Sequence, residues 1–169
     1  MTCTNDRISL AGAAAAARQV TVARDHGTPG LGHAYVMTHA PVNLSQALAS
    51  FSDVYSPRIV GRVNDYDVRI AHARGEHVWH VHEDTDEFFL VLDGTFDVSL
   101  HEDGGERTVR LRSGDIFVVP RGTEHKPSSD GGAILMFERS GTVTTGDRHE
   151  GEIPDHVDST TGHDLTGHS

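Results

Sequence analysis

The sequence is short of cysteine and of positive charge, and both shortages limit what the protein can be. Cys3 is the one cysteine among 169 residues, so no disulfide can form within the chain and nothing implies an oxidising compartment. Asp and Glu number 25 against 14 Lys and Arg, which gives a formal net charge of −11. Nucleic acids and anionic membranes bind basic faces. We therefore expect no nucleic acid and no membrane as a partner.

The sequence also lacks a long apolar run, so no segment is expected to span a bilayer. The alanine-rich stretch 8–17 has some likeness to the apolar centre of a signal peptide. Against that interpretation, Asp6 and Arg7 before it cancel in charge, and alanine is only weakly apolar. We therefore expect a cytoplasmic protein.

Residues 1–40 show no clear period of apolar residues. Within them, residues 11–17 are low in complexity and residues 27–32 carry the Gly and Pro of a loop. This segment is predicted to be a poorly ordered N-terminal extension, and Met37 is an alternative start of the organised sequence.

Residues 43–51 predict a short helix. Asn43 can cap its N-terminus, with Gln46 three residues further on as in a capping box. Three apolar residues share one face of this helix: Leu44, Leu48 and Phe51.

From residue 59 onward, apolar and polar residues alternate in short segments separated by turn residues. The segments predicted as strands lie at 59–72, 77–81, 87–92, 96–100, 108–111, 116–119 and 133–138. Asp93-Gly94 predicts a hairpin turn, and Gly104-Gly105 a second turn. Short strands at regular spacing predict an all-β sandwich or barrel.

Residues 141–169 are polar, acidic and rich in Gly, Thr and His. The histidines of this polar C-terminal tail are His149, His156, His163 and His168. They lie five or seven residues apart with no predicted element to align them. The segment is therefore expected to be a solvated tail or a strap across the barrel rather than a second metal site.

Four residues in the middle of the chain carry groups that bind metals. His80 and His82 project from one face of a strand, because strand side chains alternate between faces. Glu87 offers a carboxylate five residues further on, and His125 offers a third imidazole from a later segment. Three neutral nitrogens and one anionic oxygen suit Fe, Mn, Ni, Cu or Zn.

These residues stand in two spaced motifs that resemble those of the cupin superfamily. The first motif is a glycine, a short spacer, His-x-His, three or four residues, Glu, six residues and Gly; its matches are Gly75, His80, His82, Glu87 and Gly94, with a spacer one residue shorter than usual. The second motif is G-x5-P-x-G-x2-H-x3-N; its matches are Gly114, Pro120, Gly122 and His125, with Ser129 in place of the final Asn. The glycines fall at expected reversals, where positive φ favours them.

The resemblance implies an all-β double-stranded β-helix, a jelly-roll barrel of two antiparallel sheets over residues 41–140, preceded by the short helix. It implies that His80, His82, Glu87 and His125 hold one divalent transition metal per chain (Fe, Mn, Zn, Ni or Cu) inside one open end. Coordination positions would remain for water, O2 or a substrate oxygen. It also implies a homodimer, because many members pair through strand exchange or sheet packing.

Residues near the motifs have expected roles of their own. His72 shares a face with Val68 and Ile70 and is expected to point into the barrel, either as a hydrogen-bonded core histidine or as the candidate catalytic group. Trp79 is expected to face away from the metal and to pack beneath the helix or in a dimer contact. Four apolar residues are expected to line or underlie the cavity: Phe89, Val91, Phe96 and Val98.

The charged residues nearby leave alternatives open. Three carboxylates lie in the loop before Glu87: Glu83, Asp84 and Asp86. Such carboxylates are usually solvated; the alternative is that one of the three accepts a hydrogen bond from the N–H of a ligand histidine. The cationic candidates for holding an anionic substrate are Arg69, Arg121 and Lys126.

Two functions remain open at this point. The first is a metal-dependent enzyme acting on an oxygen-bearing small molecule, as an oxygenase (of dioxygenase type) or as an isomerase or decarboxylase. The second is a non-catalytic cupin that binds a sugar or metabolite as an accessory or sensor protein. The retained ligand set favours the enzyme.

Overall fold

The computed structural model describes residues 41–165. The expected extension 1–40, with Met37, and residues 166–169 lie outside the described residues. The regular secondary structure of the described part is strand apart from one five-residue helix, so the all-β prediction is confirmed. None of the helical structure between residues 41 and 165 is long and apolar enough to cross a membrane.

Within residues 41–165, nine strands come after the helix. In order they are β1 (Arg58–Val63), β2 (Tyr66–Glu76), β3 (Trp79–Val81), β4 (Glu87–Glu102), β5 (Gly105–Arg112), β6 (Ile116–Val119), β7 (His125–Arg139), β8 (Arg148–Glu150) and β9 (His163–Asp164).

The helix α1 (Leu44–Leu48) begins as the sequence predicts. The Asn43 side chain accepts a hydrogen bond from the Gln46 amide at 3.0 Å, which satisfies one of the free N–H groups of the first turn. The helix ends at Leu48, before Phe51, and Ala47 is its buried residue. A helix this short depends on docking against the barrel for its stability.

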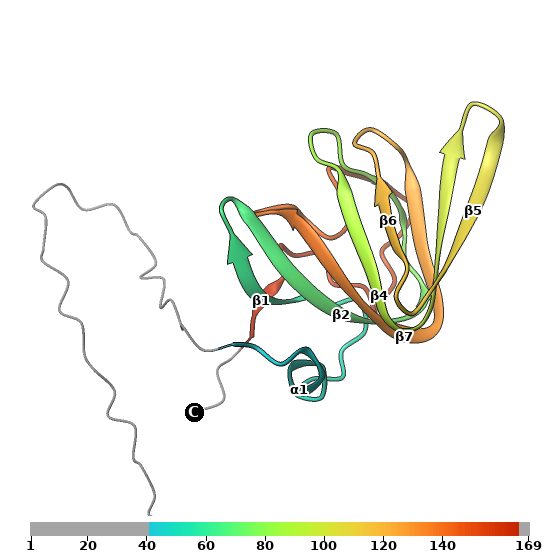
Figure 1. Ribbon diagram of the computed structural model, residues 1–169. Coiled ribbons are helices and arrows are strands. Elements are labelled where there is room, and N and C mark those ends of the chain that lie inside the picture. Colours follow the sequence, from blue (N-terminus) through green and yellow to red (C-terminus); the bar gives the residue numbers. More distant parts are fainter. Residues whose placement is uncertain (1–40, 166–169) are drawn as a thin grey trace, which may run out of the picture. The chain divides into compact units, whose positions relative to one another are not determined.

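The strands hydrogen-bond into one continuous sheet in the order β5-β4-β7-β2-β1-β9, with β3 and β6 attached to β7 and β4. The two antiparallel layers of the jelly roll are joined because β4 and β7 are long enough to run through both. Both strands curve where the sheet folds over (Figure 1). The double-stranded β-helix fold is therefore confirmed.

The predicted hairpin at Asp93-Gly94 is wrong, because β4 continues through it as a bend. The register with β7 shifts on both sides of Gly94, between Val91 and Asp93 and between Thr95 and Asp97. Gly94 has φ +73 and packs on the partner backbone, so that a Cβ there would clash with the Gly131 carbonyl oxygen. The bulge lets side chains from both halves of β4 enter one core. That core contains Phe89, Val91, Phe96, Val98 and Leu100.

Residues 141–165, which we call the strap, pair with the barrel strands. β8 lies antiparallel to β3, with Trp79 opposite Glu150 and Val81 opposite Arg148. β9 runs parallel to β1. Thr145 and Val157 are buried, and the Asp147 amide donates to the Val81 carbonyl at 2.9 Å. The described part of the tail is thus part of the folded body.

Candidate metal centre

The structure brings the four predicted ligands together. His80 lies on β3, His82 is the next residue after that strand, and Glu87 and His125 begin β4 and β7. His80 and His125 are opposite each other in the sheet register. One ligand atom from each of the four residues lies within 4.8 Å of all the others, and all four residues are buried.

Backbone carbonyls fix how two of the imidazoles are oriented. His80 Nδ1 lies 3.0 Å from the Val78 carbonyl oxygen, and His125 Nδ1 lies 3.0 Å from that of Thr123. A carbonyl oxygen only accepts, so each Nδ1 carries a proton and each Nε2 is the nitrogen that faces the four-residue group.

Two imidazole nitrogens in the group have no hydrogen-bond partner. They are His80 Nε2 and His82 Nε2, both fully buried. A buried nitrogen left unsatisfied costs about 1–3 kcal/mol, whereas a cation between these nitrogens and the Glu87 carboxylate would satisfy them. The donor set therefore fits a transition metal, and its role as a ligand set stays a prediction.

The Glu87 carboxylate is the electrostatic centre of the group. Its Oε2 lies 2.7 Å from His125 Nε2 and 3.5 Å from His82 Nε2. Burial alone would raise the pKa of Glu87, but these two imidazoles hold it well below its usual range. Burial likewise opposes charge on His82, yet Glu87 raises the pKa of His82 above its ordinary value. Burial keeps the pKa of His80 well below the usual value, so His80 is neutral.

A buried ion-pair cluster lies beside this group. The Arg69 guanidinium has no exposed surface and contacts Asp67 and Glu138, with a further hydrogen bond to the Thr142 carbonyl. Burial and then the nearby Glu87 charge raise the pKa of Glu138, while Arg69 opposes them. Glu138 therefore connects the candidate metal centre to Arg69.

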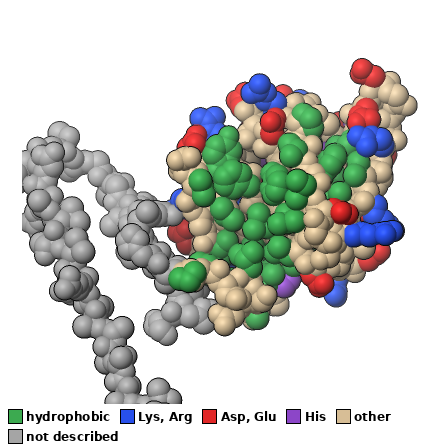
Figure 2. Space-filling model, in the orientation of Figure 1, with side chains coloured by type: hydrophobic (Ala, Val, Ile, Leu, Met, Phe, Trp, Pro, Cys, Tyr) green, Lys and Arg blue, Asp and Glu red, His purple; other side chains and the backbone are tan. Residues whose placement is uncertain are grey.

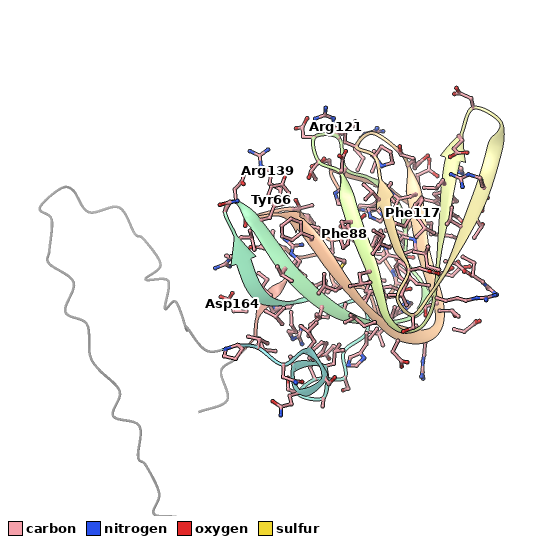
Figure 3. All side chains as sticks on the ribbon, viewed as in Figure 1. Tyr66, Phe88, Phe117, Arg121, Arg139 and Asp164 are labelled. Atoms are coloured by element: carbon pink, nitrogen blue, oxygen red, sulfur yellow. The ribbon has the colours of Figure 1, made fainter. Side chains whose placement is uncertain are left out.

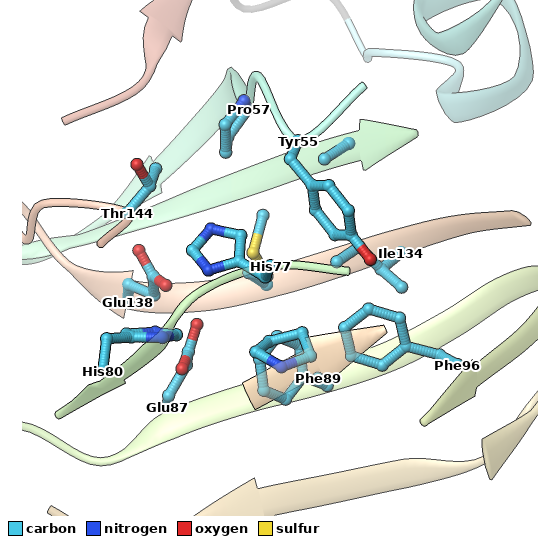
Figure 4. A pocket seen from close by; sticks show the side chains of 13 residues that line it. Tyr55, Pro57, His77, His80, Glu87, Phe89, Phe96, Ile134, Glu138 and Thr144 are labelled. Carbon is cyan, nitrogen blue, oxygen red and sulfur yellow. The ribbon is translucent and has the colours of Figure 1, made fainter. Parts of the chain in front are cut away.

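A small cavity opens on one side of the four-residue group. Its wall is mostly apolar, with polar groups from Tyr55, His77, Glu138 and Thr144 (Figure 4). The free volume is about 30 Å³, which is room for about two water molecules. The Tyr55 hydroxyl donates to the Gly75 carbonyl, and burial raises the pKa of Tyr55. Burial lowers the pKa of His77 to about 4, so this imidazole is neutral.

His72 lies outside the cavity, which corrects the expectation that it points into the barrel. Its Nε2 is 3.0 Å from the Leu48 carbonyl and 3.1 Å from the Phe51 carbonyl, so it holds the end of α1. Both faces of β2 are covered, and His72 lies on the face that α1 and the residues after it cover. The inward face carries the other set of alternating residues, including Arg69 and Ala71.

The other expected neighbours of the centre make contacts of their own. The Trp79 ring stacks on His101 with centroids 3.9 Å apart, instead of lying beneath the helix. Glu83 pairs with Arg148, and Asp86 accepts the Arg121 amide. No carboxylate of that loop contacts a ligand histidine, since backbone carbonyls take the Nδ1 protons of His80 and His125.

Of the three cationic candidates, only Arg69 lies near the cavity, and it already forms ion pairs with Asp67 and Glu138. Lys126 pairs with Glu76 at the surface. Phe89 and Phe96 line the cavity, and Val91 and Val98 lie in the core behind it.

Sequence reasoning missed Tyr55, His77, Glu138 and Thr144. Glu138 stood at the end of a predicted core strand and shares its inward face with Met136, so a buried carboxylate was detectable there. His77 lies three residues before His80, but the short segment between them hides its orientation. Tyr55 and Thr144 come from irregular segments that no periodicity could place.

The comparisons with known proteins agree with this architecture. Residues 67–137 match the family model of the cupin domain. A cupin-2 domain containing protein from Shewanella frigidimarina is 33% identical, with a TM-score of 0.54 over 58% of this chain and 93% of that one. The chain belongs to the cupin family.

Other similar proteins match over a smaller part of their length, and two of them are named as dioxygenases. The uncharacterized protein YdbB of Bacillus subtilis is 37% identical over 41% of this chain, and a 3-hydroxyanthranilate 3,4-dioxygenase of Xanthomonas campestris is 24% identical over 59% of it. This chain spans 59% and 58% of the length of these two relatives. The structure of a hydroquinone 1,2-dioxygenase from Sphingomonas is 27% identical with a TM-score of 0.51, over 59% of this chain and 32% of that one.

Proposed function

We propose that the protein binds one divalent transition metal per chain through His80, His82, Glu87 and His125, and that it acts as a dioxygenase on a small hydroxylated compound. One observation carries the proposal. Two buried imidazole nitrogens without partners converge with an ionised carboxylate beside an apolar cavity. A metal held there would supply open coordination positions for O2 and for a substrate oxygen.

The chain's own residues prepare this site. The carbonyls of Val78 and Thr123 orient two of the imidazoles before any metal arrives. Phe89, Phe96 and Ile134 keep the cavity wall apolar, which excludes water. Glu138, held by Arg69, is the carboxyl group on the wall that can accept a hydrogen bond from a substrate hydroxyl.

The dioxygenase part of the proposal draws support from two similar proteins whose names state dioxygenase activity on hydroxylated compounds. An isomerase or decarboxylase would use the same four candidate ligands, but no feature of the cavity favours either reaction. The small free volume implies that a substrate of ring size displaces wall residues.

Metal analysis of protein purified without an affinity tag tests the centre. We expect about one metal ion per chain, and loss of that metal in the double variant His80→Ala with His125→Ala. His163→Ala is the matched control, because this histidine is exposed and outside the group. Metal content that survives the double variant would end the proposal.

Oxygen uptake tests the reaction. Protein loaded with its native metal would be offered hydroxylated aromatic compounds, enols and 2-oxo acids, and we expect uptake with the hydroxylated compounds alone. Full metal content combined with binding of such compounds but no oxygen uptake would support the non-catalytic alternative.

A further inference from the structure

The cavity beside the candidate metal centre has no cationic side chain on its wall. Besides the candidate ligands, its polar groups are those of Tyr55, His77, Glu138 and Thr144. Within residues 41–165, no lysine or arginine lines it. His77 is buried and neutral, with its pKa lowered to about 4. The wall therefore offers a substrate two hydroxyls, an imidazole and a carboxyl group, and no positive charge.

Arg69, the one cationic candidate near the cavity, is committed to other groups. Its guanidinium is fully buried, forms ion pairs with Glu138 and Asp67, and donates to the Thr142 carbonyl. Glu138 lines the cavity and Arg69 does not. The remaining nitrogen, Arg69 Nε, would lie 3.6 Å from a Cβ built on Gly162, so it lies toward the strap. A substrate in the cavity therefore meets Glu138 and not its cation.

The other cations expected to hold an anion lie at the surface. Arg121 and Arg139 line a separate groove with Tyr66 (Figure 3), and Lys126 pairs with Glu76. On the face shown in Figure 2, the Lys and Arg side chains lie at the edges, most of them beside acidic side chains. The whole chain has a formal net charge of −11, so its field repels anions.

A carboxylate on a substrate would lie against this wall without a counter-charge. The proposed function reserves one substrate hydroxyl for the metal, so any other ionised group has to contact the wall. Burying a charge without a partner is costly, and the Glu138 carboxyl group adds repulsion. A neutral hydroxyl or amide group can instead exchange hydrogen bonds with Glu138, Tyr55 or Thr144.

We propose that the cavity selects uncharged hydroxylated substrates and excludes those that carry a carboxylate, phosphate or sulfonate group. The inference rests on the proposed function, which makes this cavity the substrate site. Tyr55, Glu138 and Thr144 lie outside residues 67–137, the part that matches the cupin domain. The selectivity is therefore a property of this chain's own wall residues.

Equilibrium binding under nitrogen tests the selectivity apart from any reaction. The probes are 3,4-dihydroxybenzamide and 3,4-dihydroxybenzoate, which share their hydroxyls and their size and differ by one charge. The cost of admitting a ring is then the same for both. In calorimetric titrations of protein of measured metal content, we expect the amide to bind at least about tenfold more tightly than the benzoate. Equal or tighter binding of the benzoate would overturn the proposal, and so would an amide that does not bind.

Two variants test whether the wall causes the preference. Glu138→Gln removes the counter-charge of Arg69, and Thr144→Lys adds an ammonium group at a half-buried wall position. Each should lower the preference for the amide roughly fivefold. Thr144→Lys leaves the buried ion pairs in place, so it decides the matter if Glu138→Gln does not fold. Glu102→Gln is the matched control, because its carboxylate pairs with Arg107 at the surface.

A preference that both wall variants leave unchanged would overturn the proposal, because the selectivity would then come from another part of the protein. The outcome for the proposed function is separate. A preference for the amide without oxygen uptake would reject the dioxygenase activity and leave the selectivity in place. Oxygen uptake with both probes at equal affinity would reject the selectivity and leave the dioxygenase activity in place.

Discussion

His80 and His125 hold their imidazole rings in the same way from two different strands. In each, Nδ1 bonds the carbonyl oxygen two residues earlier in its own chain at 3.0 Å. The rings lie opposite each other with centroids 4.2 Å apart. The backbone alone therefore sets which nitrogen of each ring faces the centre. Substitutions of nearby side chains should shift the positions of the two imidazole rings more than they change the rings' tautomers.

Gly146 should be sensitive to the smallest possible substitution. It has φ +72, and a Cβ there would lie 2.5 Å from the Val81 carbonyl oxygen and 3.1 Å from His80 Cδ2. Gly146→Ala is expected to destabilise the fold by about 2–4 kcal/mol and to weaken metal binding by moving His80. Urea unfolding and a metal titration would measure the two effects. Gly141→Ala is the control, because Gly141 also has positive φ but open space around it, so it should lose only about 1–2 kcal/mol and no metal affinity.

Arg69 should be among the most costly side chains to remove. Arg69→Met leaves Glu138 buried without its cation, whereas Asp67 keeps its pair with Arg62. We expect a loss of about 3–5 kcal/mol in the free energy of unfolding. Adding Glu138→Gln should recover part of that loss, which a double-mutant cycle would measure. Arg110→Met breaks an exposed pair with Asp97 and should cost about 1 kcal/mol or less. Equal losses at Arg69 and Arg110 would contradict the buried cluster.

His77 should make the protein acid-sensitive. Burial holds the pKa of His77 at about 4, below the ordinary value of 6.5. Between these values the unfolded chain binds a proton that the folded chain does not, so stability falls as the pH is lowered through that window. The contribution is on the order of 3 kcal/mol. Unfolding free energies of wild type and His77→Gln at pH 4 to 7 should show a shallower pH slope in the variant, and identical slopes would exclude this cause.

Metal binding should strengthen as the pH rises from 6 to 8. Glu87 raises the pKa of His82 above 6.5, so the metal-free centre keeps a proton there that a metal must displace. Calorimetric titration with Mn²⁺ or Zn²⁺ in buffers of different ionisation enthalpy would detect the released proton. In the metal-free protein the sign is reversed: stabilisation by the His82–Glu87 contact is complete below pH 6.5 and is lost as the pH rises through the raised pKa.

His72→Ala should affect the helix and leave the metal centre alone. The substitution removes the contacts of Nε2 with the Leu48 and Phe51 carbonyls, and we expect a loss of about 1 kcal/mol. Metal affinity should match that of wild type. A large fall in oxygen uptake at full metal content would restore His72 as a catalytic candidate.

The strand alternation predicted the all-β fold, and the motif spacing predicted that the four candidate ligands lie close together, as the structure shows. Both predictions depend on local geometry. His80 and His82 share a face whatever the rest of the chain does. Asp93-Gly94 was misjudged because a hairpin and a sharp bulge use the same local residues. The deciding feature is Gly131-Gly132 on the partner strand, which lies close enough to exclude any Cβ at Gly94.

The inward face of β2 could not be predicted from its own sequence. Val68 and Ile70 are apolar, and the alternating Asp67 and Arg69 look like solvent-facing residues. They face inward because Asp67 lies opposite Glu138 on β7, and Arg69 sits between these carboxylates. A charged face is buried here only because a distant strand supplies its counter-charges.

The strap helps to position β3, the strand that carries the candidate ligand His80. The family match ends at residue 137, yet β3, the strand of His80, has β8 of the strap along one edge and β7 along the other. A chain cut at residue 140 would keep all four ligands and lose the pairing that holds β3 in place. Domain exchange or engineering in this protein therefore has to move residues 41–165 as a unit.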